Sequence, residues 1–155
     1  KGETVLGVVY APYLNELYEA CKGKGAMLNG RSIHVSGKND TQESVVSTGF
    51  PIDKDRNPDN NLDNLARILP MVRGVRRQGS AAFDLCCVAA GILDGYWEFN
   101  LHLWDVCAGI LIVTEAGGTV RSFREDRNVS IVAGTPAIVE QLYPRLSDKP
   151  GKICL

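Results

Sequence analysis

The chain has 155 residues, the length of one ordinary domain with a buried core. Its 17 lysines and arginines nearly balance 18 acidic residues, and the net charge of −1 predicts no nucleic-acid partner. With 45% hydrophobic residues and no apolar run long enough to span a bilayer, the composition is that of a soluble globular protein, and we expect no membrane partner.

The cysteine pattern predicts reduced thiols and therefore a cytoplasmic protein, because the count is odd and no C-x-x-C pair occurs. Neither histidine is spaced near a cysteine pair, so we expect no zinc site. The cysteines are Cys21, Cys86, Cys87, Cys107 and Cys154. The chain begins with Lys1 and enters a predicted strand at once, so we expect it to be a piece of a longer protein.

An antiparallel meander is predicted for residues 1–35. Residues 4–10 are rich in β-branched side chains and residues 16–22 alternate between polar and apolar, as strands do. Asn29-Gly30 is a strong signal for a short hairpin. We assign residues 1–43 to the last strands of an antiparallel sheet region and residues 44–155 to a C-terminal α/β domain.

From Ser44 onward, predicted strands alternate with predicted helices, which is typical of an α/β layer. Together the two regions predict a layered α/β fold whose N-terminal part is missing. Strands are expected at 44–48, 72–78, 96–99, 119–123 and 129–133. Helices are expected around 62–69, from 81 to about 90, at 105–116, and from 136 to about 146.

Three features indicate a binding site. Gly79-Ser80-Ala81 forms a strand-to-helix turn, where free N–H groups attract an anion, although a plain turn capped by Ser80 is also possible. Glu98 lies between aromatic residues and could bind a substrate hydroxyl or face solvent. Asp105 begins a nearly all-apolar helix, so it is a helix cap or a ligand for a cation.

The stretch WDVCAGILIVTEAGG at 104–118 resembles the C-terminal signature of the inositol monophosphatase family. These are Mg²⁺-dependent, lithium-sensitive sugar-phosphate phosphatases that often form homodimers. Further segments resemble family landmarks in the same order: GVVYAP at 7–12, KGKGAML at 22–28, STGFP at 47–51, GSAAFD at 79–84, DGYWEF at 94–99 and IVAGTP at 131–136.

The resemblance implies a role for each matching position. Asp105 matches a metal ligand, and Glu98 matches the acid that contacts a substrate hydroxyl. Gly79, Ser80 and Ala81 match the turn that lines the substrate pocket. The expected function is that of the C-terminal portion of a phosphomonoesterase, with Mg²⁺ as cofactor and inositol monophosphate or a related sugar phosphate as substrate.

The family's other metal-binding motifs, a Glu-Glu pair and an Asp-Pro-x-Asp-Gly-Thr loop, do not occur in this sequence. Mg²⁺ needs several converging oxygen ligands, so we expect the chain alone to be inactive and to contain no complete catalytic set.

Alternatives stay open at this point. Relatives of the same superfamily act on fructose 1,6-bisphosphate or phosphoadenosine phosphates, and a second phosphate would need a cation such as Arg76 or Arg77. Because neighbouring strand residues face opposite ways, at most one of these arginines could serve. A non-catalytic binding or dimerisation module is the other possibility.

Overall fold

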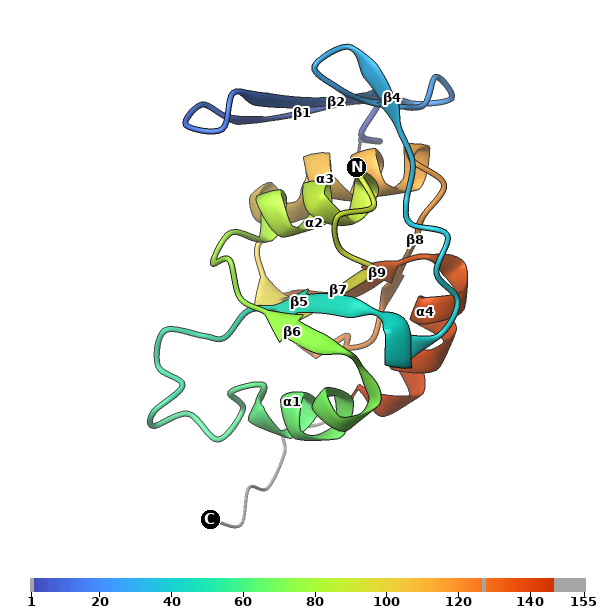
Figure 1. Cartoon of the computed structure of the whole chain (residues 1–155). Helices are drawn as coiled ribbons and strands as arrows, with labels where there is room; N and C mark the ends of the chain where they lie inside the picture. Colours follow the sequence, from blue (N-terminus) through green and yellow to red (C-terminus); the bar gives the residue numbers. More distant parts are fainter. Residues whose placement is uncertain (1, 127, 147–155) are drawn as a thin grey trace.

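The computed structural model describes residues 2–126 and 128–146, which form four stacked layers (Figure 1). An antiparallel sheet lies at one end, and two helices separate it from a second sheet. Two further helices cover the far face of the second sheet. The inner helices are α2 (Ala81–Ala89) and α3 (Leu103–Glu115), and the outer ones are α1 (Leu62–Ile68) and α4 (Pro136–Leu142).

The first sheet has four antiparallel strands in sequence order, as the meander prediction required. They are β1 (Leu6–Ala11), β2 (Glu16–Cys21), β3 (Ala26–Leu28) and β4 (Arg31–Ile33). The Asn29-Gly30 turn joins β3 to β4, and both residues have positive φ, 50° and 73°. Two positive values are what a tight hairpin turn needs, and Asn and Gly tolerate them best.

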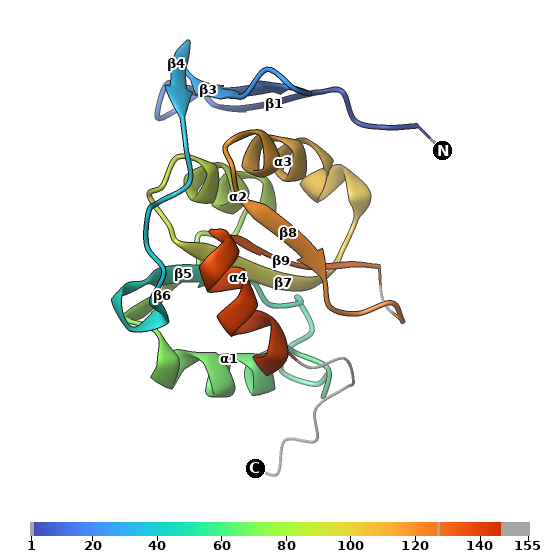
Figure 2. The ribbon, with the colours of Figure 1, turned by 90° about the vertical axis from the view of Figure 1, so that its right-hand side faces the viewer.

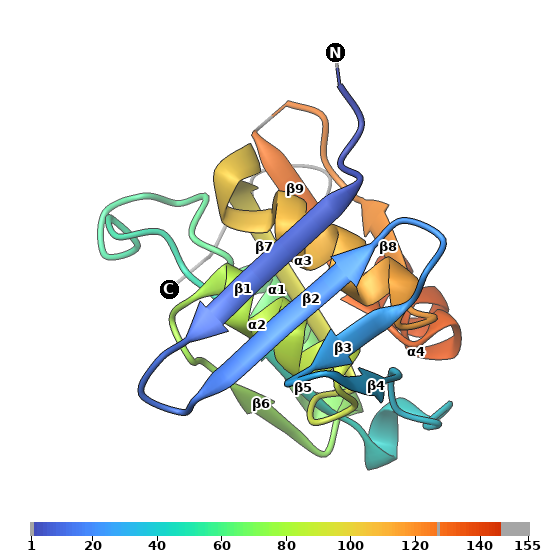
Figure 3. The same ribbon diagram turned by 90° about the horizontal axis from the view of Figure 1, so that it is seen from above.

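One face of this sheet packs on helix α3. Seen from above, β1 and β2 run across α2 and α3 (Figure 3). Gly7 of β1 permits the close approach, because a Cβ atom there would lie 2.9 Å from the backbone oxygen of Ala108. Three apolar side chains of β1 point to the opposite face and are exposed: Leu6, Val8 and Tyr10.

The second sheet is mixed and has the strand order β6-β5-β7-β9-β8. Strand β5 runs parallel to β6 and β7, whereas β9 is antiparallel to β7 and β8. The strands are β5 (Val45–Thr48), β6 (Gly74–Arg76), β7 (Gly95–Leu101), β8 (Thr119–Ser122) and β9 (Val129–Gly134).

Strand β7 divides the core between the two sides of this sheet. Tyr96 joins the cluster under helices α2 and α3, whereas Trp97 and Phe99 join the cluster under α1 and α4. The alternation predicted from the sequence is therefore correct. It places Glu98 on the same face as Tyr96, toward α2 and α3.

A connecting segment runs along the side of the layers from β4 to β5 (Figure 2). Asp94, just before β7, holds this segment. Its buried carboxylate accepts hydrogen bonds from Ser36 Oγ at 2.6 Å, Lys38 Nζ at 3.0 Å and the Val45 N–H at 2.7 Å. Short 3₁₀ turns lie at Thr41–Glu43, Leu69–Met71 and Tyr143–Arg145.

The expected α/β layered fold is confirmed, with differences in detail. Strand β6 covers only Gly74–Arg76, not 72–78. Helix α4 gives way to a 3₁₀ turn after Leu142, because Pro144 cannot donate an N–H to the helix. Helix α3 begins at Leu103, two residues earlier than predicted. Among the described residues no helix has the length and apolarity to cross a membrane. Cys154 lies outside the described part of the chain.

Candidate functional site

A pocket of about 470 Å³ opens where β5, β7, α2 and α3 meet. It brings together the turn before α2, Glu98 of β7 and Asp105 of α3, the three features singled out in the sequence. The full lining is Gly49, Phe50, Ile52, Arg77, Gly79, Ser80, Ala81, Ala82, Glu98, Leu101, Trp104 and Asp105.

The turn at 79–81 leads into helix α2 and presents the helix start to the pocket. Gly79 has a φ of +88°, which a residue with a side chain adopts only with strain. Ser80 occupies the N-cap position, but its hydroxyl makes no capping hydrogen bond. The helix end therefore keeps N–H groups that no side chain of the described residues caps, as an anion site requires.

Asp84 supports this turn from beneath. It is 1% exposed, and its Oδ1 accepts a hydrogen bond at 3.0 Å from Nε2 of Gln78, the residue before Gly79. Burial raises the pKa of Asp84, whereas hydrogen bonds lower it. Asp84 has no separate role in the sequence prediction, since its burial does not show in the residue pattern.

Glu98 lies half-buried in the pocket wall. Its Oε2 accepts a hydrogen bond of 2.6 Å from the hydroxyl of Tyr96, and Tyr96 is fully buried. Burial raises the pKa of Glu98, while the Tyr96 hydroxyl and the charge of Arg77 lower it. The alternative of a solvent-facing glutamate is incorrect, because the carboxylate points into the pocket.

Gly49 makes room for that carboxylate. A Cβ atom at Gly49 would overlap the carboxylate of Glu98, so no larger residue fits without displacing it. Beneath Gly49, Asn61 donates to the Gly49 carbonyl at 2.7 Å and to Thr48 Oγ1 at 2.9 Å, and accepts from Trp97 Nε1 at 3.0 Å. Gly49 lies within the STGFP segment, but nothing in that sequence shows its contact with Glu98.

Asp105 occupies the third position of helix α3, so the prediction that it is the N-cap is wrong. His102 takes the cap position, and Asp105 Oδ2 accepts a hydrogen bond of 2.9 Å from its backbone N–H. The prediction failed because Leu103 and Trp104 already adopt helical geometry. Asp105 lines the pocket, and its Oδ1 accepts no hydrogen bond from the described residues.

One aromatic side chain stands at the pocket rim beside Asp105. Trp104 is 75% exposed and stacks on His102, with ring centroids 4.3 Å apart and an interplanar angle of 12°.

Of the two neighbouring arginines, the structure brings Arg77 to the pocket wall. Arg76 does not line the pocket and donates from Nη1 to the carbonyl of Val75 at 3.1 Å. Arg77 is close enough to lower the pKa of both Glu98 and Asp84. The pocket therefore carries two acidic side chains and one basic one.

A complete metal centre is not formed by the described residues alone. Within 2–126 and 128–146, no three His, Cys, Asp or Glu side chains lie together in a group able to hold an ion. Asp105 is a hard oxygen donor of the kind that Mg²⁺ prefers, and it fits as one ligand of several.

Comparison with known proteins shows which family the chain resembles. The model of the inositol monophosphatase family matches residues 1–149. "Putative Nus factor SuhB" of Neisseria meningitidis is 42% identical over 95% of this chain and 58% of its own length. "Nus factor SuhB" of Escherichia coli is 39% identical over 96% and 57%. The chain thus spans about three fifths of the length of these relatives.

Solved structures give the same result. The inositol monophosphatase of Anabaena superposes with a TM-score of 0.87 at 37% identity, over 96% of this chain and 61% of that one.

The names of the relatives overturn one expectation. A net charge of −1 predicted no nucleic-acid partner, but relatives at about 40% identity are named Nus factors. The prediction is wrong because a net charge sums over the whole chain and does not describe any one surface. The matched family model, the relatives and the fold agree, and the chain belongs to the inositol monophosphatase family.

Proposed function

We propose that the chain supplies the substrate wall and one metal ligand of a Mg²⁺-dependent phosphomonoesterase that acts on inositol monophosphate or a related sugar phosphate. The observation that carries this proposal is the convergence in one pocket of the 79–81 turn, Glu98 and Asp105. These positions come from three separate elements, and each offers a group that a phosphorylated polyol needs.

Each group has a distinct part in binding. The N–H groups at the start of α2 attract negative charge through the helix dipole. Glu98, as a carboxylate, accepts a hydrogen bond from a ring hydroxyl. Its fixed place against Gly49 selects where that hydroxyl must lie.

Asp105 is the proposed metal ligand through Oδ1, because Oδ2 is held by the N–H of His102. When bound, Mg²⁺ would neutralise phosphate charge and lower the pKa of a water molecule. Mg²⁺ needs further oxygen ligands, so we propose that the 155-residue chain alone does not turn over substrate.

The test measures phosphate release from inositol 1-phosphate with Mg²⁺ in three samples. They are the chain alone, the chain mixed with the part of the N. meningitidis relative that it does not match, and the same mixture with Asp105→Asn. We expect turnover in the second sample alone. Equal turnover by the mixture and its Asp105→Asn form would refute the role of Asp105, and turnover by the chain alone would refute the need for other ligands.

Arg77 favours a second phosphate as the main alternative within this chemistry, as in fructose 1,6-bisphosphate or phosphoadenosine phosphates. It is the basic side chain in the pocket lining, and none of the described residues forms an ion pair with it. Assaying these bisphosphates beside inositol 1-phosphate, with wild type and Arg77→Met, decides between the classes. A bisphosphatase loses activity with Arg77→Met, whereas a monophosphatase keeps it.

A Nus factor is the second candidate function, and the names of the relatives favour it. In such a role, Asp105 would not act as a metal ligand for catalysis, so Asp105→Asn should keep the function. The discriminating experiment expresses wild-type chain and Asp105→Asn in Escherichia coli that lacks its own Nus factor SuhB. Rescue by both would support this candidate, and rescue by neither would count against it. The four described cysteines are free thiols, which supports a cytoplasmic location for either function.

A further inference from the structure

We infer that Tyr96 is a positioning residue: its hydroxyl holds Oε2 of Glu98 and leaves Oε1 as the acceptor for a ring hydroxyl of the ligand. The inference rests on the proposed function, since it concerns the same pocket. It adds a residue that does not itself line the pocket.

The contact between the two residues is short and sheltered. Tyr96 is 0% exposed, and its hydroxyl lies 2.6 Å from Glu98 Oε2. Both side chains leave the same face of β7, because residues two apart in a strand point the same way. Hydrogen bonds to ionised groups are stronger than hydrogen bonds between neutral groups. This contact therefore holds the Glu98 side chain in one orientation.

The Tyr96 hydroxyl acts as a donor throughout the accessible pH range. Burial and the neighbouring carboxylates raise its pKa well above the ordinary value, so it keeps its proton. A buried tyrosine hydroxyl has one hydrogen to donate, and here it goes to Oε2.

One further contact restricts the position of the Glu98 carboxylate. The carboxylate lies against the backbone of Gly49, where no side chain could fit. Among the residues that the structure describes, Oε1 accepts no hydrogen bond. Glu98 lines the pocket, and one of its oxygens is thus held while the other keeps its acceptor capacity.

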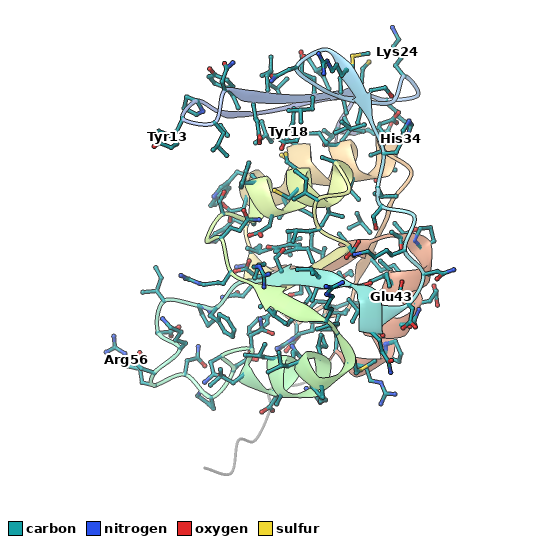
Figure 4. All side chains as sticks on the ribbon, in the orientation of Figure 1. Tyr13, Tyr18, Lys24, His34, Glu43 and Arg56 are labelled. Carbon is teal, nitrogen blue, oxygen red and sulfur yellow. The ribbon has the colours of Figure 1, made fainter. Side chains whose placement is uncertain are left out.

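Tyr18 provides a matched control elsewhere in the molecule. It is also 0% exposed and donates at 2.7 Å to a glutamate two residues away, Oε2 of Glu16. Its ring lies between the first sheet and the helices beneath it (Figure 4), edge-on to Phe83. Tyr18→Phe removes the same chemical group from the same kind of contact, but away from the pocket.

The experiment titrates the chain with inositol 1-phosphate and its single-deoxy analogues in the presence of Mg²⁺, followed by NMR. In wild type, one analogue should bind about tenfold more weakly, which identifies the hydroxyl on Glu98. Tyr96→Phe should weaken the binding of inositol 1-phosphate about tenfold and leave the affinity for that analogue unchanged. Tyr18→Phe should affect neither ligand.

If Tyr96→Phe weakened the binding of both ligands to the same degree, the substitution would have disturbed the whole pocket, and the inference would be overturned. Unchanged affinity for both would overturn it as well.

A separate readout does not depend on ligand binding. In chain labelled with ¹³C at the glutamate carboxyl, the Glu98 signal, assigned with Glu98→Gln, should shift in Tyr96→Phe and not in Tyr18→Phe. If wild type binds none of the sugar phosphates, the proposed function fails, and the shift still shows whether Tyr96 holds Glu98. An unmoved Glu98 signal overturns the inference itself.

Discussion

Gly109 of helix α3 lies directly against Leu85 of helix α2. A Cβ atom at Gly109 would lie 2.7 Å from Cδ1 and 2.8 Å from Cβ of Leu85, closer than real carbon atoms approach. Leu85 is fully buried, so it has no free space to move into. Gly109 thus sets how closely the two helices that carry the turn and Asp105 approach each other.

Gly109→Ala should therefore destabilise the chain by about 1–3 kcal/mol, the usual cost of overpacking a core. Urea unfolding followed by circular dichroism measures this loss. Gly37→Ala is the control, because Gly37 is exposed and a Cβ atom there would meet nothing within 4 Å. If Gly109→Ala were as stable as Gly37→Ala, the helices would have to be farther apart than they are here.

Arg124 offers a comparison between a buried and an exposed ion pair. Its side chain is 2% exposed and binds Asp59 at 2.7 Å and Asp126 at 2.7 Å. Arg124→Met removes the cation that pairs with the buried Asp59 carboxylate, which should cost about 3–5 kcal/mol. Thermal and urea unfolding both register a change of this size.

The matched variant is Arg121→Met, which breaks the exposed pair between Arg121 and Glu140. Exposed pairs contribute little, so we expect a loss of about 1 kcal/mol. Equal losses of unfolding free energy for the two variants would show that the buried ion pair contributes no more to stability than the exposed one.

Much of the fold could be predicted from local pattern, because the pattern itself is physical. The alternation of Tyr96, Trp97 and Glu98 correctly gave the two faces of β7, and Asn29-Gly30 gave its hairpin. The start of α3 could not be predicted so precisely. Asp is a good cap by residue type, yet the cap is His102. Asp105 is the third residue of the helix and accepts a hydrogen bond from the His102 N–H.

The residue pattern singled out Gly79, Glu98 and Asp105, and the resemblance to a family implied a role for each. Their convergence in one cavity is a property of the tertiary structure. The residues that support this cavity could not be predicted from the sequence. Gly49 and Asp84 matter through contacts across the fold, with Glu98 and Gln78 respectively, and such contacts depend on tertiary packing.

Asp84 should make stability depend on pH. Burial is the largest cause of its raised pKa, so the folded chain binds a proton here more readily than the unfolded chain. The associated stability is fully present below the ordinary pKa of 3.8 and is lost as pH rises through the raised value. Asp84→Asn removes the charge and keeps an oxygen that can accept from Gln78.

The measurement compares the unfolding free energies of wild type and Asp84→Asn from pH 4 to pH 8. We expect the unfolding free energy of the variant to rise relative to that of wild type as pH rises, because only wild type carries the buried charge, which is unfavourable. A constant difference across this range would show that Asp84 titrates alike in both states. Glu140→Gln serves as the control, since the Glu140 side chain is 70% exposed.

The outer face of the first sheet should cause the chain to self-associate. Leu6, Val8 and Tyr10 are 64%, 49% and 55% exposed on β1, and Met27 of β3 is 42% exposed. These side chains share one face of paired strands, on which Glu19 of β2 lies between Val8 and Met27. The apolar surface is therefore concentrated along β1. Strand β1 is also an edge whose outer N–H and C=O groups have no neighbouring strand among the described residues.

Light scattering should give a mass above the 16.9 kDa of one chain, rising with concentration. The double variant Val8→Lys and Tyr10→Lys puts two charges on that face and should return the mass to that of a monomer, since like charges repel across a symmetric contact. Ile92→Lys, at a side chain 59% exposed in the loop after α2, should leave the association unchanged. A wild-type chain that stays monomeric at high concentration would refute the prediction. Association that persists in the double variant would place the contact on another face.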